Sequence, residues 1–221
     1  MNKKNMNIIV RAFQIHLLVL AAAVSPLVAD DEPQITRHVF PSLDGNFVAE
    51  RVLEGISQPT AIELLPDGRA LVSQRDRGLV TIADFSSGSK TDIQGLPKLV
   101  VFSDTGVHDL ELHPEYGKNG WIYVAYTEGE QYHSTAVVDR FKLEGTKAVE
   151  VERIFTADAY SEGAYHYAAR MQFKDGDLYF ALGDRQHPPM AQDNSNHAGT
   201  VVRLKADGSV PDDNPFIGRE E

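Results

Sequence analysis

His166 and Asp184 are the residues of this sequence whose types and spacing best fit proton transfer. They flank a predicted β-hairpin that turns at Asp175-Gly176, so both side chains can lie at the open end of one hairpin. Imidazole titrates near neutral pH and can remove the proton of a hydroxyl group, while a carboxylate on the second ring nitrogen would fix the tautomer. Taken alone, the residues favour a structural histidine at the edge of a strand over a catalytic one.

Arg170 begins the first strand of the same hairpin and could bind a ligand carboxylate or a developing anion. Other polar groups favour structural roles. His108 and His113 are five residues apart on a predicted strand, so they would face opposite sides of it rather than share a metal ion. The run 212–214 offers oxygen ligands but no complete calcium loop, which favours a capped turn. No phosphate-binding glycine loop and no Gly-x-Ser-x-Gly motif occurs, so nucleotide and serine-hydrolase functions have no support.

The elements that must position these residues form a repeat. An apolar strand, a tight turn and a second apolar strand recur at Ala61–Gln74, Asp109–Tyr126 and Arg170–Asp184. A further strand follows each copy, as GLVTIADF, TAVVDRFKLEG and GTVVRLKADG. Repeated small sheets predict an all-β chain and a β-propeller, because a β-sandwich would not require this doubled repeat. About three blades fit into the chain, whereas closed propellers have roughly four to eight.

Composition limits the partners and the compartment. The 221 residues carry a net charge of −11 and no cysteine, which disfavours nucleic acid as a partner and excludes disulfides and thiolate metal sites. Residues 1–29 have the basic start, short apolar stretch and small-residue end of a secretory signal peptide. We therefore expect a periplasmic or secreted protein with no membrane span once the signal is cleaved. An N-terminal segment, 30–57, would precede the partial propeller, 58–221.

From Gln58 to Phe216 the sequence resembles the soluble sugar dehydrogenases that use pyrroloquinoline quinone (PQQ), the glucose/sorbosone and aldose sugar dehydrogenase family. Five phrases carry the resemblance, in the family's order and spacing: LPDGRALVSQRDRG, GVHDLELHPEYGKNGWIYVAY, YHYAAR, LYFALGDR and AQDNSNHAGTVVRLKADGSVPDDNPF. The resemblance implies a six-bladed β-propeller, of which this chain has the N-terminal blades. It also implies PQQ and Ca²⁺ as cofactors, an aldose oxidised at its anomeric hydroxyl to a lactone, an external electron acceptor and a possible homodimer.

Matched onto this sequence, the family pattern makes His166 the general base and Asp184 the residue that orients it. It places Arg170, Gln192 and Asp104 beside the cofactor and leaves the metal ligands unknown.

Two departures from the family pattern keep a second function open. Ala168 and Ala169 stand where the family has two glycines, and Asp104 brings an anion where the family often has a glutamine. Both could hinder a flat, polyanionic cofactor. The later blades that complete the family's PQQ and calcium site are absent from this sequence, so we expect an incomplete chain. The alternatives are a non-catalytic secreted propeller that binds a carbohydrate or a protein, and a calcium-dependent lactonase.

Overall fold

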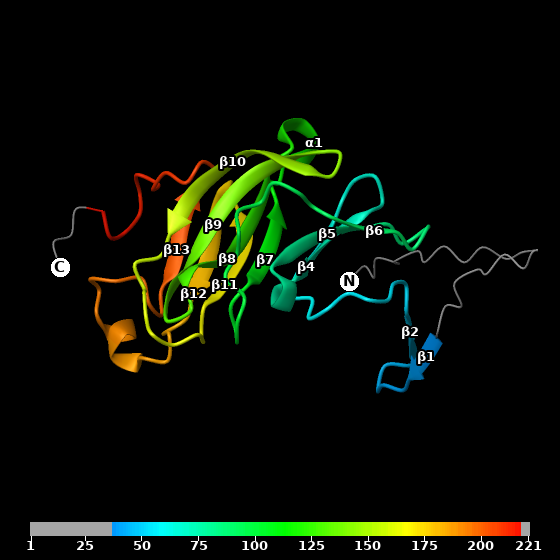
Figure 1. Cartoon of the computed structure of the whole chain (residues 1–221), viewed down its shortest axis with the longest axis horizontal. Helices are drawn as coiled ribbons and strands as arrows, with labels where there is room; N and C mark the ends of the chain where they lie inside the picture. Colours follow the sequence, from blue (N-terminus) through cyan, green and yellow to red (C-terminus); the bar gives the residue numbers. More distant parts are fainter. Residues whose placement is uncertain (1–36, 218–221) are drawn as a thin grey trace, which may run out of the picture. The chain divides into compact units, whose positions relative to one another are not determined.

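The computed structural model describes residues 37–217, and these residues form one short hairpin and three antiparallel sheets (Figure 1). The hairpin is β1 (Arg37–Phe40) with β2 (Phe47–Glu50). The first sheet contains β3 (Ile62–Leu64), β4 (Ala70–Gln74), β5 (Leu79–Ala83) and β6 (Lys90–Asp92). The second contains β7 (Val107–Leu112), β8 (Ile122–Glu130), β9 (His133–Glu144) and β10 (Lys147–Thr156). The third contains β11 (Ala168–Lys174), β12 (Asp177–Leu182) and β13 (Val201–Lys205).

In each sheet, strands that are consecutive in the chain pair with one another, which is the connectivity of a propeller blade. The predicted hairpins are β3–β4, β7–β8 and β11–β12, and the predicted further strands are β5, β9 and β13. Turn chemistry explains two of the hairpins: Gly68 has φ 89°, while Asp175 and Gly176 have φ 54° and 92°. Glycine adopts these left-handed angles without strain, so each turn can reverse the chain tightly.

The second sheet is packed on both faces. Alternate residues of β8 divide between two buried cores: Ile122 and Val124 join the core shared with the first sheet, while Tyr123 and Ala125 join the core shared with the third. Successive side chains of a strand point to opposite faces, so β8 serves both cores at once. Blades that bury both faces against their neighbours are what a propeller requires. The prediction of an all-β chain that forms about three blades of a β-propeller is therefore confirmed.

Side chains of β7 tie the innermost strands together. Asp109 accepts hydrogen bonds from the Met171 backbone N–H (2.6 Å) and from Arg170 Nη1 (2.9 Å), both on β11. Glu111 accepts a bond from the Phe173 backbone N–H at 3.2 Å. Carboxylates that accept backbone N–H groups across a blade boundary fix the position of one inner strand against the next.

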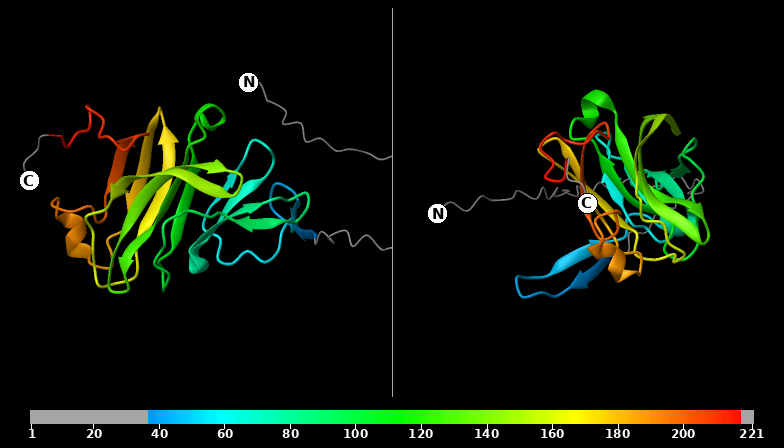
Figure 2. Two further views of the ribbon diagram at one scale, coloured as in Figure 1. Left: turned by 45° about the horizontal axis from the view of Figure 1, so that its top comes forward. Right: turned by 90° about the vertical axis from the view of Figure 1, so that its left-hand side faces the viewer.

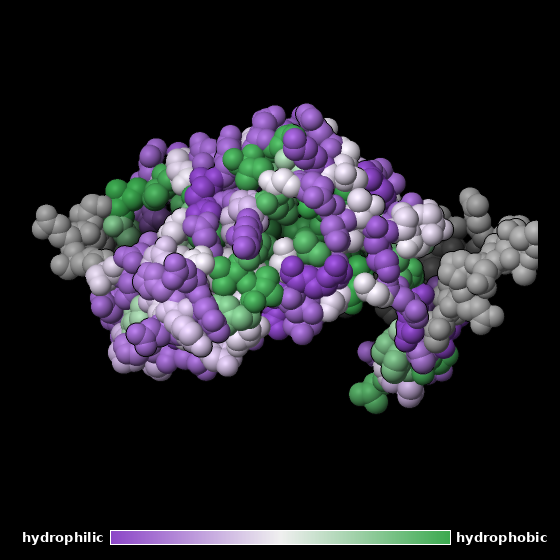
Figure 3. Space-filling view, in the orientation of Figure 1, coloured by the Kyte–Doolittle hydropathy of each residue, from purple (hydrophilic) through white to green (hydrophobic). Residues whose placement is uncertain are grey.

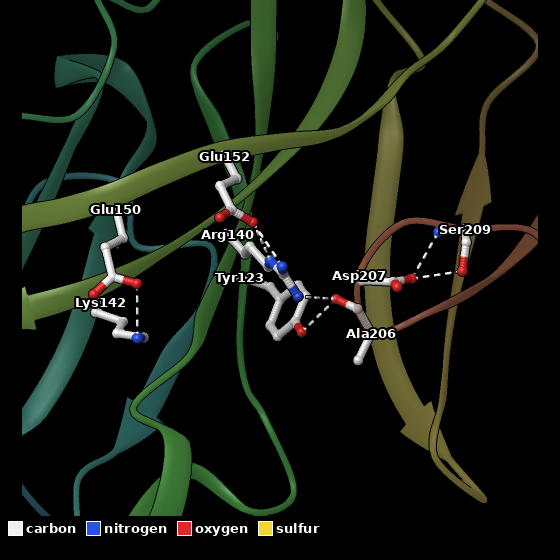
Figure 4. Close-up of polar contacts among 8 residues, drawn as sticks. All are labelled: Tyr123, Arg140, Lys142, Glu150, Glu152, Ala206, Asp207 and Ser209. Carbon is white, nitrogen blue, oxygen red and sulfur yellow. Dashed lines mark hydrogen bonds and ion pairs between the residues drawn. The ribbon is translucent and has the colours of Figure 1, made fainter.

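A second link joins these two blades at their outer part (Figure 4). The carbonyl oxygen of Ala206, in the turn after β13, accepts hydrogen bonds from Tyr123 Oη (2.7 Å) and Arg140 Nη1 (2.9 Å). Arg140 also donates to Glu152 and lies over the Trp121 ring, 4.2 Å from its centroid. The turn is thus held by an arginine that is itself fixed by an ion pair and an aromatic ring.

Within residues 37–217, three short helices lie between the strands: η1 (Arg75–Arg77), α1 (Tyr116–Asn119) and η2 (Pro188–Gln192). Two views agree that η1, the β8–β9 turn and η2 lie along one edge of the sheets, with α1 at the opposite edge (Figures 1 and 2). The segment 157–167, which precedes β11, lies at the same edge as η2. This edge, which lies at the bottom of Figure 1, carries the candidate site and is called the upper face from here on.

The β1–β2 hairpin falls within the predicted N-terminal segment and exposes most of its apolar side chains, including Phe47 (Figure 3). The predicted signal peptide, 1–29, lies outside the described residues and stays a prediction. No helix among residues 37–217 is long and apolar enough to cross a membrane.

Candidate active site on the upper face

The two residues expected to work together do contact each other. His166 Nδ1 lies 2.7 Å from Asp184 Oδ1, so the carboxylate accepts the Nδ1–H bond and leaves the Nε2 lone pair facing outward. The His166 side chain is 52% exposed, and Nε2 has no hydrogen-bond partner among residues 37–217. The hydrogen bond from His166 lowers the pKa of the Asp184 carboxyl, and the Gln186 backbone N–H, 3.1 Å from Oδ1, lowers it further. Asp184 therefore stays ionised and holds the imidazole in one orientation.

The backbone around this pair is strained. His166, Ala168 and Ala169 have φ values of 56°, 58° and 63°, and Arg185 and Gln186 both have 57°. Residues with a Cβ adopt this left-handed region only at a cost of about 1–2 kcal/mol each. Five such residues on two facing segments mark the candidate site as the place where the fold stores backbone strain.

Gly183 shows why the two segments can approach so closely. A Cβ at this position would lie 2.0 Å from the His166 carbonyl oxygen, so only glycine fits. The Gly183 backbone N–H instead donates to the Tyr167 carbonyl at 3.1 Å. The contact brings the end of β12, and with it Asp184, against the residues that precede β11.

Arg185 holds the segment that precedes His166. Its side chain is only 3% exposed, and it donates to the carbonyl oxygens of Gly163 (2.6 Å), Tyr165 (3.1 Å), Ser134 (3.2 Å) and Ala159 (3.3 Å). Its guanidinium lies over the Tyr167 ring at 3.6 Å. Burial lowers the pKa of Arg185, and no carboxylate of the described residues pairs with it. Sequence reasoning missed this role, because backbone carbonyls leave no signal in a sequence.

His108 lies beneath the site. Its Nε2 is 2.7 Å from Thr127 Oγ1, and its ring stacks on the Tyr167 ring with centroids 5.2 Å apart. Burial lowers the pKa of His108 to about 4, and the charges of Arg75, Arg185 and Arg170 lower it further, while Asp104 raises it. The prediction that His108 has a structural role is supported by this burial and stacking.

The positive charges of three arginines, which are Arg75, Arg170 and Arg185, therefore lie near the buried His108 ring. Two of them are also paired with carboxylates, because Arg75 Nη1 lies 3.1 Å from Asp104 Oδ1 and Arg170 binds Asp109. The Asp104 backbone N–H donates to the Ala164 carbonyl at 3.2 Å, which ties its loop to the segment before His166. Asp104 thus does not add an unbalanced negative charge, as the sequence had suggested, because Arg75 neutralises it.

Arg170 also lines a cavity of about 780 Å³ between β3, β7 and β11, where Glu63, Asp109 and Glu111 gather. Burial raises the pKa of Glu63 to about 7, and the negative charge of Glu111 adds to the effect. Gln192 ends η2 with an exposed side chain that makes no hydrogen bond to the described residues. The structure thus brings His166, Asp184 and the Asp104 loop together, and does not bring Gln192 into contact with them.

The described residues do not supply a metal site. Among residues 37–217 no group of three or more His, Asp or Glu side chains is arranged to hold a metal ion. The run 212–214 is a turn, as predicted: the Asn214 N–H donates to the Pro211 carbonyl at 3.0 Å, and Asp213 pairs with Arg203. The ligands of the expected Ca²⁺ therefore stay unassigned among residues 37–217.

Consecutively paired blades and a histidine–carboxylate pair on one face define part of a β-propeller of the type found in dehydrogenases of sugars. Residues 56–221 match the family described as Glucose / Sorbosone dehydrogenase, and the chain belongs to this family. The resemblance seen in the sequence is thereby confirmed.

Two relatives illustrate the match. The chain is 27% identical over 172 residues to aldose sugar dehydrogenase YliI of Escherichia coli, covering 76% of this chain and 46% of the relative. It is 23% identical over 198 residues to quinoprotein glucose dehydrogenase B of Acinetobacter calcoaceticus, covering 77% and 41%.

Solved structures agree. The apo-form soluble aldose sugar dehydrogenase from E. coli superposes with a TM-score of 0.72 at 26% identity, over 83% of this chain and 51% of that one. The PQQ-bound aldose sugar dehydrogenase of Streptomyces coelicolor gives 0.68 at 24% identity, over 85% and 54%, which shows the shared fold. The chain spans about half the length of the relatives it matches.

Proposed function

We propose that this chain carries the proton-transfer half of the active site of a PQQ-dependent aldose dehydrogenase, exported to the periplasm or secreted. The observation that carries the proposal is the 2.7 Å contact between His166 Nδ1 and Asp184 Oδ1, with the other ring nitrogen open to the upper face. Membership of a sugar dehydrogenase family that includes a quinoprotein supports the substrate class and the cofactor.

His166 would act as the general base. With its Nδ1–H bonded to Asp184, Nε2 can accept the proton of the anomeric hydroxyl of an aldose, and the ionised carboxylate stabilises the imidazolium that results. Arg185 would keep Nε2 in place, because it fixes the carbonyl of Tyr165 directly before His166. The sugar loses two electrons and becomes a lactone.

PQQ, when bound, supplies the acceptor for the hydride that leaves the sugar carbon. It is a flat molecule with three carboxylates, and the donors near His108 suit such an anion. Arg170, whose guanidinium uses only Nη1 for Asp109, and Arg75 would hold its carboxylates. Asp104 would act through Arg75, whereas Gln192 belongs to the proposal through the family alone. Calcium, an external electron acceptor and a homodimer belong to the proposal through the family alone.

The test uses two histidines of neighbouring loops. In the complete protein, His166→Ala should abolish PQQ-dependent oxidation of glucose while PQQ binding, followed by its absorption spectrum, stays within twofold of the wild type. His187→Ala is the matched control, because the His187 side chain makes no hydrogen bond within residues 37–217, and its activity should not change. Unchanged turnover in His166→Ala would contradict the proposed base.

A non-catalytic propeller that binds a carbohydrate or a protein remains the second candidate. The observation that favours it is the strained alanine pair, because Ala168 and Ala169 hold left-handed angles that the family's glycines would adopt freely. Binding of glucose without any PQQ binding would favour this candidate. A calcium-dependent lactonase would instead hydrolyse a lactone in the absence of quinone.

A further inference from the structure

Tyr167, the residue directly after His166, is buried in the core beneath the candidate site and is only 2% exposed. The Arg185 guanidinium lies over its ring at 3.6 Å, and the His108 ring stacks on it with centroids 5.2 Å apart and planes 24° from parallel. Burial lowers the pKa of His108 to about 4, so its ring is neutral at pH 7 and is not repelled by the guanidinium. These two contacts hold the flat ring of Tyr167 in one orientation.

Hydrogen bonds fix the two ends of the same residue. Tyr167 Oη lies 2.7 Å from Ser134 Oγ, and Ser134 forms an antiparallel bridge with Ser161. At the other end, the Tyr167 carbonyl oxygen accepts the Gly183 N–H at 3.1 Å. Because the ring, the hydroxyl and the carbonyl are each held, the backbone of Tyr167 can move only when buried contacts break.

His166 has few contacts of its own that could fix it. Its side chain is 52% exposed, and the bond from Nδ1 to Asp184 is the only hydrogen bond of this side chain within residues 37–217. Its φ of 56° is a conformation that a residue with a Cβ keeps only where surrounding contacts impose it. Because the peptide bond between His166 and Tyr167 is planar, the anchored tyrosine sets the direction in which the imidazole leaves the backbone.

We propose that Tyr167 is a positioning residue, which holds His166 so that Nδ1 stays on Asp184 and Nε2 faces outward. The effect on turnover rests on the proposed function, whereas the effect on the imidazole requires no reaction. A displacement of about 1 Å at a reacting group can cost about 100-fold in rate, so a loosely held base would act much more slowly.

Tyr123 offers a matched control in the same core. It is fully buried, belongs to the same core cluster as Tyr167, and donates its hydroxyl to the Ala206 carbonyl at 2.7 Å. It lies near the start of β8, towards the edge that carries α1. Leucine at either position removes a buried ring and a hydroxyl bond, but only Tyr167→Leu should affect His166.

The first measurement uses the 221-residue chain without PQQ. The ¹⁵N shifts of the His166 ring, assigned by their loss in His166→Ala, give the ratio of the two neutral forms, with the proton on Nδ1 or on Nε2. The wild type should carry the proton on Nδ1. Tyr167→Leu should lower this ratio by about tenfold or more, the factor that a bond to a charged group is worth. The pKa of the Asp184 carboxyl, which the bond from His166 lowers, should then rise towards its usual range.

Tyr123→Leu should change neither the ratio nor the Asp184 pKa. A milder pair of variants decides the outcome where a leucine variant does not fold. Tyr167→Phe keeps the ring and loses only the bond to Ser134, so it should lower the ratio about 2- to 10-fold, which corresponds to one hydrogen bond. Tyr123→Phe should leave the ratio unchanged. If the Tyr167 variants that fold keep the wild-type ratio, or if the Tyr123 variants lower it equally, Tyr167 only packs the core and the proposal is overturned.

Kinetics of the complete protein separate this inference from the proposed function. Tyr167→Leu should lower kcat for PQQ-dependent oxidation of glucose about 10- to 100-fold, while KM and PQQ binding stay within about twofold of the wild type. In an active enzyme, an unchanged kcat would overturn the positioning role. If the wild type oxidises no sugar, the dehydrogenase is overturned, and the ratio of the two neutral forms alone upholds or overturns the positioning.

Discussion

The strained alanines next to His166 lead to a prediction whose sign is unusual. Alanine to glycine normally destabilises a strand, by about 0.5–1 kcal/mol, because glycine has more freedom to lose on folding. At Ala168, with φ 58°, alanine already bears about 1–2 kcal/mol of left-handed strain that glycine would not bear. Ala168 is exposed, so its methyl group contributes little burial. Ala168→Gly should therefore raise the free energy of unfolding by about 0.5–1 kcal/mol.

The same comparison at the neighbouring alanine predicts a smaller change in the free energy of unfolding. Ala169 has φ 63° but is fully buried, so glycine would relieve the same strain and lose about 0.8 kcal/mol of methyl burial. Ala169→Gly should leave the free energy of unfolding nearly unchanged. The matched control is Ala181→Gly, at an exposed position of β12 with an ordinary φ, which should lower stability by about 0.5–1 kcal/mol.

Urea denaturation followed by the fluorescence of Trp121 measures all three variants. The midpoints should rank Ala168→Gly above the wild type, Ala169→Gly close to it and Ala181→Gly below it, with slopes unchanged. An Ala168→Gly midpoint that falls as far as that of Ala181→Gly would refute the strain, and with it the argument that strain gathers at this site.

Three further predictions concern buried or paired charges. The folded pKa of Glu63, about 7, is raised above its unfolded value, so stability is lost as pH rises from about 4.5 to 7. At pH 8 the free energy of unfolding of Glu63→Gln should exceed that of the wild type by about 1–2 kcal/mol, after allowance for half-exposure. At pH 4.5 urea titrations should find the two proteins equally stable. The folded pKa of His108, about 4, is depressed, so stability present above pH 6.5 is lost as pH falls towards 4. In His108→Gln, whose side chain can still bond Thr127, the free energy of unfolding should fall by about 3 kcal/mol less over this pH range than in the wild type. Arg140→Met should release the turn after β13 and lower the free energy of unfolding by about 1–2 kcal/mol. Its thermal midpoint should fall further than that of Arg51→Met, a control at an exposed arginine.

The blades and the contact between His166 and Asp184 could be predicted because their signals are local. The hairpins β3–β4 and β11–β12 have an Asp-Gly turn between apolar strands, and the geometry of the second hairpin brings His166 and Asp184 to one end. The residues by themselves favoured a structural histidine, and only the family pattern favoured a catalytic one.

The rest of the site could not be predicted, because its contacts join distant segments through groups that every residue has. Arg185 binds carbonyl oxygens of residues 20 to 51 positions away, and any sequence supplies those oxygens. The charge that Asp104 adds depends on Arg75, 29 positions earlier in the chain. Pairings of this kind follow from how the blades pack and not from spacing.

The buried charge of Arg185 and the backbone strain at this face are connected, because the hydrogen bonds of Arg185 hold the strained segments in place. The left-handed residues on either side of the Gly183 contact raise the energy of the folded state locally, and such strain persists only where surrounding contacts over-determine the backbone. The carbonyl bonds of Arg185 supply those contacts, and each bond from a charged donor contributes about 1.5–3 kcal/mol. Arg185→Met should therefore do more than lower stability: the segment before β11 should relax, the His166–Asp184 hydrogen-bonded proton should vanish from the NMR spectrum, and Ala168→Gly added to this variant should lose its stabilising effect. If the two substitutions instead add independently, the strain is local to the alanine and Arg185 does not sustain it.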